Sequence, residues 1–346
     1  MEKIILTGLL PDEITESLGL EQKFRGRQIF RWIGAGAGNF DMMTNLSAEL
    51  RTRLKDMALL RSSSVTGTLR DPDGTVKLQI TLHDGNAVET VLLTDREGRR
   101  TACVSCQAGC AMGCAFCRTG TLGLARNLLP GEIVEQFLWL EQEAGRLDNI
   151  VFMGMGEPMQ NLDGIRKAVR ILTDRDGRAL SARRITLSTC GIIKGIYDLA
   201  ENGPSVRLAV SLTTADQKFR EELMPIAKAN PLPELKRAVR FFTEKTGRRV
   251  TLEAALMDGV NTDTDAATDM MEFAAGLDVN INLIPWNPVP GLPFREPSAG
   301  TTENFAERLR RAGLNVTLRT RRGRSIGGAC GQLGRTEVND NAQQQD

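Results

Sequence analysis

The chain has 346 residues, of which 41% are hydrophobic and 25% are charged, and its formal net charge is +1. These values are ordinary for a soluble globular protein and allow one large catalytic domain with a smaller appendage. No apolar run approaches the roughly 20 residues that a bilayer-spanning helix needs, and the N-terminus lacks the apolar segment of a signal peptide. We therefore expect a cytoplasmic protein with no membrane partner, in which local basic patches provide any binding to nucleic acid.

The first part of the chain predicts a small helical domain followed by a β extension. Residues 1–60 are typical of short helices, and the stretch 24–33 has apolar side chains near one stripe of a helix. Residues 61–98 contain two alternating strands around the turn signal Asp84-Gly-Asn. The two strands of this predicted hairpin are 76–82 and 88–93.

Residues 99–335 alternate between predicted strands and helices, which favours βα units and a parallel sheet. The strands are predicted at 101–105, 150–153, 185–188, 206–211, 250–255, 281–285 and 316–319. The helices include 131–144, 162–172, 232–245 and 302–312. These units are too few for a closed eight-stranded barrel, so we expect an α/β fold with an open, partial (β/α)6 barrel. Residues 336–346 lack apolar periodicity, and we expect them to be disordered.

Three cysteines, Cys110, Cys114 and Cys117, follow the first barrel strand with C-x3-C-x2-C spacing. Thiolates hold iron–sulfur clusters, and a full set is four; three ligands leave one metal position open for a reactant. A zinc site would need a fourth ligand, and His83 is the only histidine. A disulfide suits the expected reducing compartment less well. We therefore expect a [4Fe–4S] cluster that binds S-adenosylmethionine (SAM), because radical SAM enzymes use this spacing.

Further polar motifs follow other predicted strands, at 154–158, 188–191, 211–213 and 285–288. The C-terminal ends of parallel barrel strands converge on one mouth, so these motifs are expected to form one cofactor pocket. Taken singly, each motif is equally typical of a tight turn or a helix cap. The residues expected to contact SAM are Gly156, Glu157, Ser188, Ser211, Leu212, Thr213 and Asn287.

Two cysteines outside the triplet attract attention because of their positions. Cys103 lies on the first barrel strand, and Cys330 lies between glycines beyond the last strand. Glycines beside a thiol allow a large substrate to approach closely. From the residues alone, each cysteine is either a reactive thiol or a small buried side chain, and the pattern does not decide between them.

The combination of Cys103 with the cluster loop, the stretches 152–158 and 282–288, and Ala329-Cys-Gly-Gln-Leu is highly distinctive. It resembles the RlmN/Cfr family of radical SAM rRNA adenine methyltransferases over essentially the whole chain, and most closely the RlmN-type adenine C2 enzymes. The stretch 24–30 is similar to the family's N-terminal accessory domain, which implies that residues 1–60 help to bind RNA.

The resemblance implies a reaction that uses two SAM molecules per turnover. One SAM methylates Cys330, and a second, bound at the open iron, yields a 5′-deoxyadenosyl radical that takes a hydrogen atom from the new methyl group. The resulting carbon radical adds to the adenine ring, and Glu89 accepts the ring proton. Cys103 then attacks the sulfur of Cys330, and the transient disulfide releases the methylated base.

The implied substrates are adenine 2503 of 23S rRNA and adenine 37 of tRNAs, modified at C2. Methylation at C8, as in the Cfr branch, and another radical SAM reaction are the alternatives. The resemblance also implies a monomer served by an electron donor such as flavodoxin or ferredoxin. The arginines Arg319, Arg321, Arg322 and Arg324 precede Cys330 and are candidate phosphate contacts.

The chain departs from the family pattern at four places. Thr213 stands where the family commonly has histidine, and Cys106 and Cys190 stand where serine is common. Arg324 begins a stretch that replaces an acidic lead-in to the Cys330 motif. None of these departures affects the five cysteines to which the resemblance assigns chemical roles.

Overall fold

The computed structural model describes residues 3–334, so the predicted disordered tail lies outside the described residues. The described strands form a ten-stranded sheet and two two-stranded pairs. The large sheet has the order β14-β13-β12-β11-β10-β9-β6-β5-β4-β3. Its strands are β3 (Ser64–Arg70), β4 (Val76–Thr81), β5 (Ala87–Thr94), β6 (Arg100–Cys103), β9 (Asn149–Phe152), β10 (Ile185–Thr189), β11 (Arg207–Ser211), β12 (Val250–Leu256), β13 (Val279–Pro285) and β14 (Asn315–Leu318).

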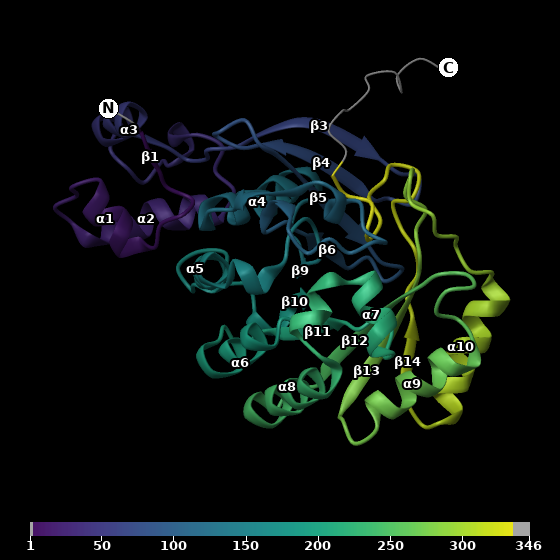
Figure 1. Ribbon diagram of the computed structural model, residues 1–346. Coiled ribbons are helices and arrows are strands. Elements are labelled where there is room, and N and C mark those ends of the chain that lie inside the picture. The colour runs from purple at the N-terminus through teal and green to yellow at the C-terminus, as the bar shows by residue number, and fades with distance from the viewer. Residues whose placement is uncertain (1–2, 335–346) are drawn as a thin grey trace, which may run out of the picture.

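Within the large sheet, the strands β6 and β9 to β14 are all parallel and follow chain order. Their C-terminal ends therefore lie on one side, as in a barrel mouth. Figure 1 shows α4, α5, α6 and α8 along the outer side of this curved sheet. The helices of this part are α4 (Pro130–Ala144), α5 (Leu162–Thr173), α6 (Ile193–Asn202), α7 (Gln217–Leu223), α8 (Leu232–Thr246), α9 (Thr264–Ala274) and α10 (Ala299–Arg311). The prediction of an open, partial α/β barrel is confirmed, and its seven predicted strands appear at nearly the predicted boundaries.

The barrel core forms because apolar side chains recur with the period of each element. In α5, the side chains of Leu162, Ile165, Val169 and Leu172 lie on one stripe and are buried in the main hydrophobic core. In β13, buried and half-buried residues alternate along the whole strand, as expected for side chains that point to opposite faces. Helix stripes and strand faces thus pack together and hold the strand ends in fixed positions.

The β extension continues the barrel sheet. The predicted hairpin is confirmed as the antiparallel strands β4 and β5, and β5 also pairs with β6, the first barrel strand. The strand β3, which the sequence analysis did not predict, forms the outer edge next to β4. As a result, β6 has a hydrogen-bonded neighbour on both sides.

The predicted N-terminal helices are confirmed as α1 (Pro11–Ser17), α2 (Lys23–Gly34) and α3 (Ala48–Met57), which are joined by the short parallel pair β1 (Ile4–Ile5) and β2 (Ala58–Leu59). Gly26 lets α2 lie close to α1, because a Cβ at this position would collide with Thr15 and with the Pro11 carbonyl. Among residues 3–334, no helix combines the length and the apolar character that crossing a membrane requires. The domain boundaries stay a prediction.

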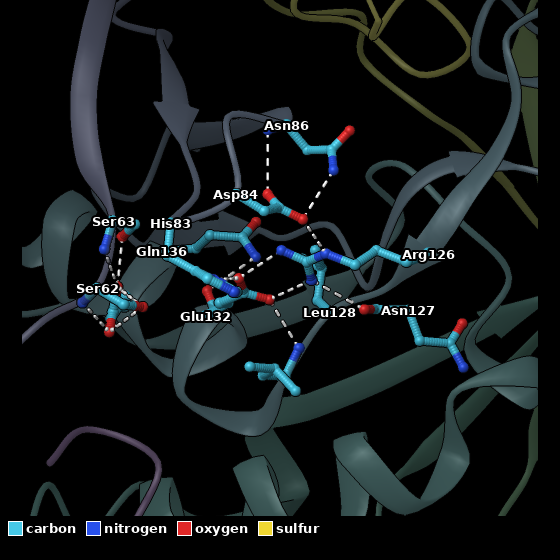
Figure 2. Close-up of polar contacts among 12 residues, drawn as sticks. Ser62, Ser63, His83, Asp84, Asn86, Arg126, Asn127, Leu128, Glu132 and Gln136 are labelled. Atoms are coloured by element: carbon cyan, nitrogen blue, oxygen red, sulfur yellow. Dashed lines mark hydrogen bonds and ion pairs between the residues drawn. The ribbon is translucent and has the colours of Figure 1, made fainter. Parts of the chain in front are cut away.

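A polar network fastens the start of α4 to the strand that follows the cluster loop. Figure 2 shows Arg126 between Asp84 and Glu132. Arg126 Nη2 lies 2.8 Å from Glu132 Oε1, and Glu132 Oε2 accepts a 2.8 Å hydrogen bond from the Leu129 amide. Arg126 belongs to β8 (Gly123–Asn127), which pairs with β7 (Gln107–Cys110). The network therefore supports the β7–β8 pair, whose first strand ends at Cys110.

Candidate active site

The three predicted cluster ligands lie on one short segment at the mouth of the barrel. Cys110 is the last residue of β7, and Cys114 and Cys117 follow in the loop, where the Cys117 amide donates to the Cys114 carbonyl at 3.1 Å. Gly109 has a φ of +80°, and a Cβ there would collide with the carbonyl of Gly123 on β8. All three cysteines line a single cavity of about 180 Å³.

The chemistry of these thiols fits an iron–sulfur cluster. Within residues 3–334, no three His, Cys, Asp or Glu side chains converge tightly enough to hold one metal ion. A mononuclear zinc site needs such convergence, because its Zn–S bonds are about 2.3 Å long, whereas a cluster distributes its thiolates over separate irons. Burial raises the pKa of Cys110 to about 11 and also raises the pKa values of Cys114 and Cys117. These ligands must therefore lose protons when iron binds.

Six of the seven predicted SAM contacts line the same cavity as the cysteine triplet. They are Gly156, Glu157, Ser188, Ser211, Thr213 and Asn287. Leu212 does not line it. This residue is fully buried, and its backbone is held by the Glu253 carbonyl at 2.8 Å and by Arg220 Nε at 3.2 Å. Leu212 thus fixes the backbone between its two neighbours, which do line the cavity.

The turn after β9 lies close to the backbone that precedes the cluster loop. Gly156 has a φ of +103°, and a Cβ there would be 2.6 Å from the Cβ of Gln107. Glu157 is buried, and its carboxylate accepts hydrogen bonds from the amides of Met159 at 3.0 Å and Cys190 at 2.8 Å. Burial raises the pKa of Glu157. Its side chain therefore joins the loops after β9 and β10, and its neighbour Gly156 leaves cavity space free.

Two features of the cavity wall suit a polar ligand. The side-chain oxygen of Asn287 is buried without a hydrogen-bond partner, although its Nδ2 donates to the Cys330 carbonyl at 3.1 Å. Buried polar atoms are nearly always satisfied, so this oxygen is a natural acceptor for a ligand. Thr213 has a φ of +61°, which is strained for a β-branched residue, and such strain clusters at ligand sites. The cavity therefore fits SAM beside a cluster.

Sequence analysis missed two charged residues at this site. Glu253 lines the cavity from β12, and its oxygens lie 3.1 Å from Ser188 Oγ and 3.1 Å from Asn282 Nδ2. The signal that could have revealed it is a carboxylate in the middle of a mainly apolar strand. Arg220, on α7, is fully buried, and its Nη2 donates to the Cys190 carbonyl at 2.7 Å. Nothing in the local sequence pattern distinguishes Arg220 from a surface helix residue.

The two further thiols meet at a second cavity of about 460 Å³. Both Cys103 and Cys330 line it, together with Arg319, Arg321 and Arg322. Cys330 also lines the smaller cavity that contains the cysteine triplet. Burial raises the pKa of Cys103 to about 12, the nearby Cys330 adds to this rise, and the Arg319 guanidinium opposes it. Cys330 therefore lies at the boundary between the cysteine triplet and Cys103.

The structure does not bring Glu89 into either of these cavities. Glu89, on β5, is buried and forms a 2.7 Å ion pair with Lys77 on β4. It lines a third cavity that also includes Met155 and Gly334. Arg324 does not line the cavity of about 460 Å³ either; it forms an ion pair with Glu296. The role that the resemblance implies for Glu89, and the phosphate contact expected of Arg324 from its place near Cys330, stay predictions.

An open parallel barrel with a cysteine triplet after its first strand is the architecture of the radical SAM superfamily, which residues 104–271 match. Residues 12–60 match the N-terminal domain of ribosomal RNA large subunit methyltransferases. A solved radical SAM methyltransferase from Sphaerobacter thermophilus has the same fold, with a TM-score of 0.91 and 42% identity over 95% of this chain and 99% of its own.

More specific relatives define the family. A probable dual-specificity RNA methyltransferase RlmN from Treponema denticola is 58% identical over 98% of both chains. A dual-specificity RNA methyltransferase RlmN from Syntrophobacter fumaroxidans is 41% identical over 93% of this chain and 94% of its own. The present chain belongs to the RlmN family of radical SAM methyltransferases.

Proposed function

We propose that this protein is a SAM-dependent RNA methyltransferase that methylates C2 of adenine 2503 in 23S rRNA and of adenine 37 in tRNAs. The observation that carries the proposal is the position of Cys330, which lines both the cavity of the cysteine triplet and the cavity of Cys103. The names of the relatives, which describe dual-specificity RNA methyltransferases, support RNA as the substrate.

In this proposal the smaller cavity holds the cofactors. Cys110, Cys114 and Cys117 would bind one [4Fe–4S] cluster per chain, and the unpaired oxygen of Asn287 would accept a hydrogen bond from SAM. The cluster and SAM, when bound, supply the one-electron chemistry that activates a methyl group. Two SAM molecules are used per turnover, because one of them provides the methyl group that Cys330 carries.

The two thiols of the larger cavity, Cys330 and Cys103, have different proposed roles. Cys330 carries the methyl-derived carbon to the adenine, which leaves the base bonded to the protein through this sulfur. The thiolate of Cys103 attacks that sulfur and a disulfide forms. The bond between the sulfur and the carbon attached to the base breaks, and the carbon keeps the electron pair and takes up a proton to become the methyl group. A two-electron reductant must restore both thiols. The family resemblance is the support for Glu89 as the acceptor of the ring proton.

The larger cavity has the charge that an RNA substrate requires. Five arginines and two carboxylates line it, so positive charge is in excess: Arg96, Arg99, Arg319, Arg321 and Arg322, with Asp95 and Glu97. Arginines attract phosphates through a strong and salt-dependent interaction. Chemistry on a ring carbon needs a base that has left its stack, and RNA loops offer such bases. Adenine would thus reach Cys330 from the arginine side, opposite the cysteine triplet.

The remaining parts of the proposal concern the protein's partners and location. We infer a cytoplasmic monomer that receives electrons from a flavodoxin or a ferredoxin. Methylation at C8 is the alternative outcome, because the same thiols serve either position. Mass spectrometry of nucleosides from digested RNA separates the two isomers, and 8-methyladenosine as the product would replace the C2 assignment.

The proposal is tested with purified protein, SAM, a reductant and an rRNA fragment under anaerobic conditions. We expect Cys330→Ala to abolish RNA methylation while 5′-deoxyadenosine still forms, and Cys103→Ala to accumulate RNA bonded to the protein. The matched control is Cys106→Ser, because Cys106 is also buried but lines neither cavity. Undiminished methylation by Cys330→Ala would eliminate the covalent mechanism.

A further inference from the structure

A buried ion pair lies directly beneath the segment that carries Cys330. Lys77 Nζ and Glu89 Oε1 are 2.7 Å apart, and the two side chains are only 3% and 5% exposed. The proposed reaction gives Lys77 no role. Burying two charges costs free energy that their attraction alone often fails to return, so the position of this pair calls for a structural reason.

The sheet register directs both side chains to the same face. Glu89 is opposite Gln79 in the β4–β5 ladder, and Lys77 is two residues from Gln79. Alternate residues of a strand share a face, so the two charged groups form a diagonal cross-strand pair. Figure 1 shows the C-terminal residues, drawn in yellow, close to β4 and β5.

Each member of the pair also binds the backbone of that C-terminal segment. Lys77 Nζ donates to the Gly327 carbonyl at 3.4 Å, and Glu89 Oε2 accepts a hydrogen bond from the Gly334 amide at 2.6 Å. Cys330 lies between these two anchor points. Hydrogen bonds that involve a charged group are stronger than neutral ones, so the ion pair holds residues 327–334 at both ends, with the shorter bond at Gly334.

Contacts between the anchors complete the placement of Cys330. The Gly331 carbonyl accepts a 2.8 Å hydrogen bond from the amide of Arg118, which directly follows the cluster loop. The Cys330 carbonyl accepts from Asn287 at 3.1 Å. The segment is thus attached to the sheet at its ends and to the cluster side in its middle, and this arrangement holds Cys330 at the boundary of the two cavities.

We propose that Lys77 and Glu89 act together as a clamp that positions Cys330 between the cluster side and Cys103. This inference rests on the proposed function, because it assumes that Cys330 carries the methyl group. Lys77 is a positioning residue that acts through the segment 327–334. Glu89 has the same positioning task in addition to its proposed role as proton acceptor.

The first measurement is hydrogen exchange of the segment, which depends on neither the cluster nor RNA. Lys77→Met and Glu89→Ala are expected to speed amide exchange in the peptide 325–334 by about tenfold, because each removes one anchor and local opening then becomes easier. The matched control is Arg178→Met, which breaks a 2.8 Å pair with Glu141 that is also largely buried and does not contact this segment. Exchange in Lys77→Met at the rate of the control would overturn the clamp.

The double variant Lys77→Met/Glu89→Gln tests whether faster exchange in Lys77→Met results only from the instability caused by an unpaired buried charge. It removes both charges, so no unpaired ion stays buried, and the amide oxygen of the substituted side chain on β5 can still accept from Gly334. We expect its free energy of unfolding to exceed that of Lys77→Met. We also expect its amide exchange to be slow again at Gly334, which keeps a hydrogen-bond acceptor, but not at Gly327, whose carbonyl has lost Lys77. Recovery of protection at both glycines would also contradict the clamp.

The second measurement is the fraction of Cys330 that carries a methyl group in purified protein, read by peptide mass spectrometry. We expect this fraction to fall about fivefold or more in Lys77→Met relative to wild type and to Arg178→Met, since misplacement of a reacting group lowers rates steeply. An unchanged fraction in Lys77→Met would show that the pair does not position Cys330. Absence of the methyl group from the wild type would instead contradict the proposed function, and the exchange measurement would still test the clamp.

Discussion

The two cavities share Cys330 and the neighbouring wall residues Met153, Ile284 and Asn287, but they differ in the charged groups that line them. The smaller one is built from strand ends and from the cysteine loop, and its ionisable side chains, Glu157 and Glu253, are buried and hydrogen-bonded within the wall. The larger one is lined by arginines from the β5–β6 turn and from the residues after β14. The charged groups of one wall are therefore buried carboxylates, and those of the other include exposed and half-buried arginines.

This difference separates two tasks that a single pocket would perform poorly. Iron–sulfur and radical chemistry need a site from which water is excluded. An RNA strand needs accessible positive charge that can replace the counterions of its phosphates. Cys330 connects the two environments. Changes on the cluster side should therefore stop the chemistry altogether, and changes on the arginine side should weaken or slow it.

The largest expected effect is that of Cys114→Ala, which removes one of the three proposed cluster ligands. We expect it to abolish the cluster absorbance, the formation of 5′-deoxyadenosine and the methylation of RNA, because the remaining two thiols do not complete the set. Anaerobic reconstitution with iron and sulfide, followed by product analysis, provides the measurement. A Cys114→Ala protein that still cleaves SAM would contradict the cluster assignment.

The next effect concerns the stability of the smaller cavity. Gly156→Ala is expected to lower the free energy of unfolding by about 3 kcal/mol, because a positive φ and a collision with Gln107 act together. Gly247→Ala is the matched control, since Gly247 has a φ of +66° but open space around its Cα, and we expect a loss of only about 1 kcal/mol. Equal losses in chemical denaturation would mean that the cavity wall accommodates the methyl group.

A smaller effect is expected from Arg319, which faces both thiols of the larger cavity. Its positive charge lowers the pKa of Cys103 against the effect of burial. Arg319→Met should therefore raise this pKa further and shift the pH profile of disulfide formation between Cys103 and Cys330 to higher pH. A shift of one unit reduces the thiolate fraction about tenfold at neutral pH. Arg319→Lys keeps the charge, so its pH profile should stay near that of the wild type. An unshifted profile in Arg319→Met would show that Arg319 does not influence the Cys103 thiol electrostatically.

The smallest effect is expected from Arg322, one of the arginines on the RNA side. Arg322→Met should weaken RNA binding by severalfold and reduce the slope of log affinity against log salt by about one. The cluster absorbance should not change. The control is Arg311→Met on α10, because Arg311 is highly exposed, pairs with Glu307 and does not line the cavity. An identical salt dependence in the two variants would argue against a phosphate contact at Arg322.

The sequence predicted the cluster side better than the arginine side, and the reason is physical. Strand ends of a parallel barrel converge on one mouth whatever the side chains are. The motif at Gly156 and the serines Ser188 and Ser211 could therefore be assigned to one pocket before any contact was known. Leu212 does not line this pocket, although its neighbours Ser211 and Thr213 do, because successive residues at a strand end point to opposite sides.

Other features depended on contacts between distant parts of the chain. The clamp joins residues 77 and 89 to residues 327 and 334, and no local pattern links these positions. Arg220 resembles a surface helix residue until its carbonyl partners are known. The edge strand β3 has no fully buried residue, so its apolar signal is weak. Loop and edge geometry of this kind is decided by tertiary packing.

The pairing of β6 has a consequence for how the two thiols can come together. Cys103 is the last residue of β6 and is registered with Val91 on β5 and with Val151 on β9. A strand held on both flanks cannot slide without breaking two ladders at once. The backbone of Cys103 is therefore held in place from both sides, so in the proposed reaction the two sulfurs would approach each other mainly through rotation of the two cysteine side chains, with the backbone of Cys330 held between its anchors.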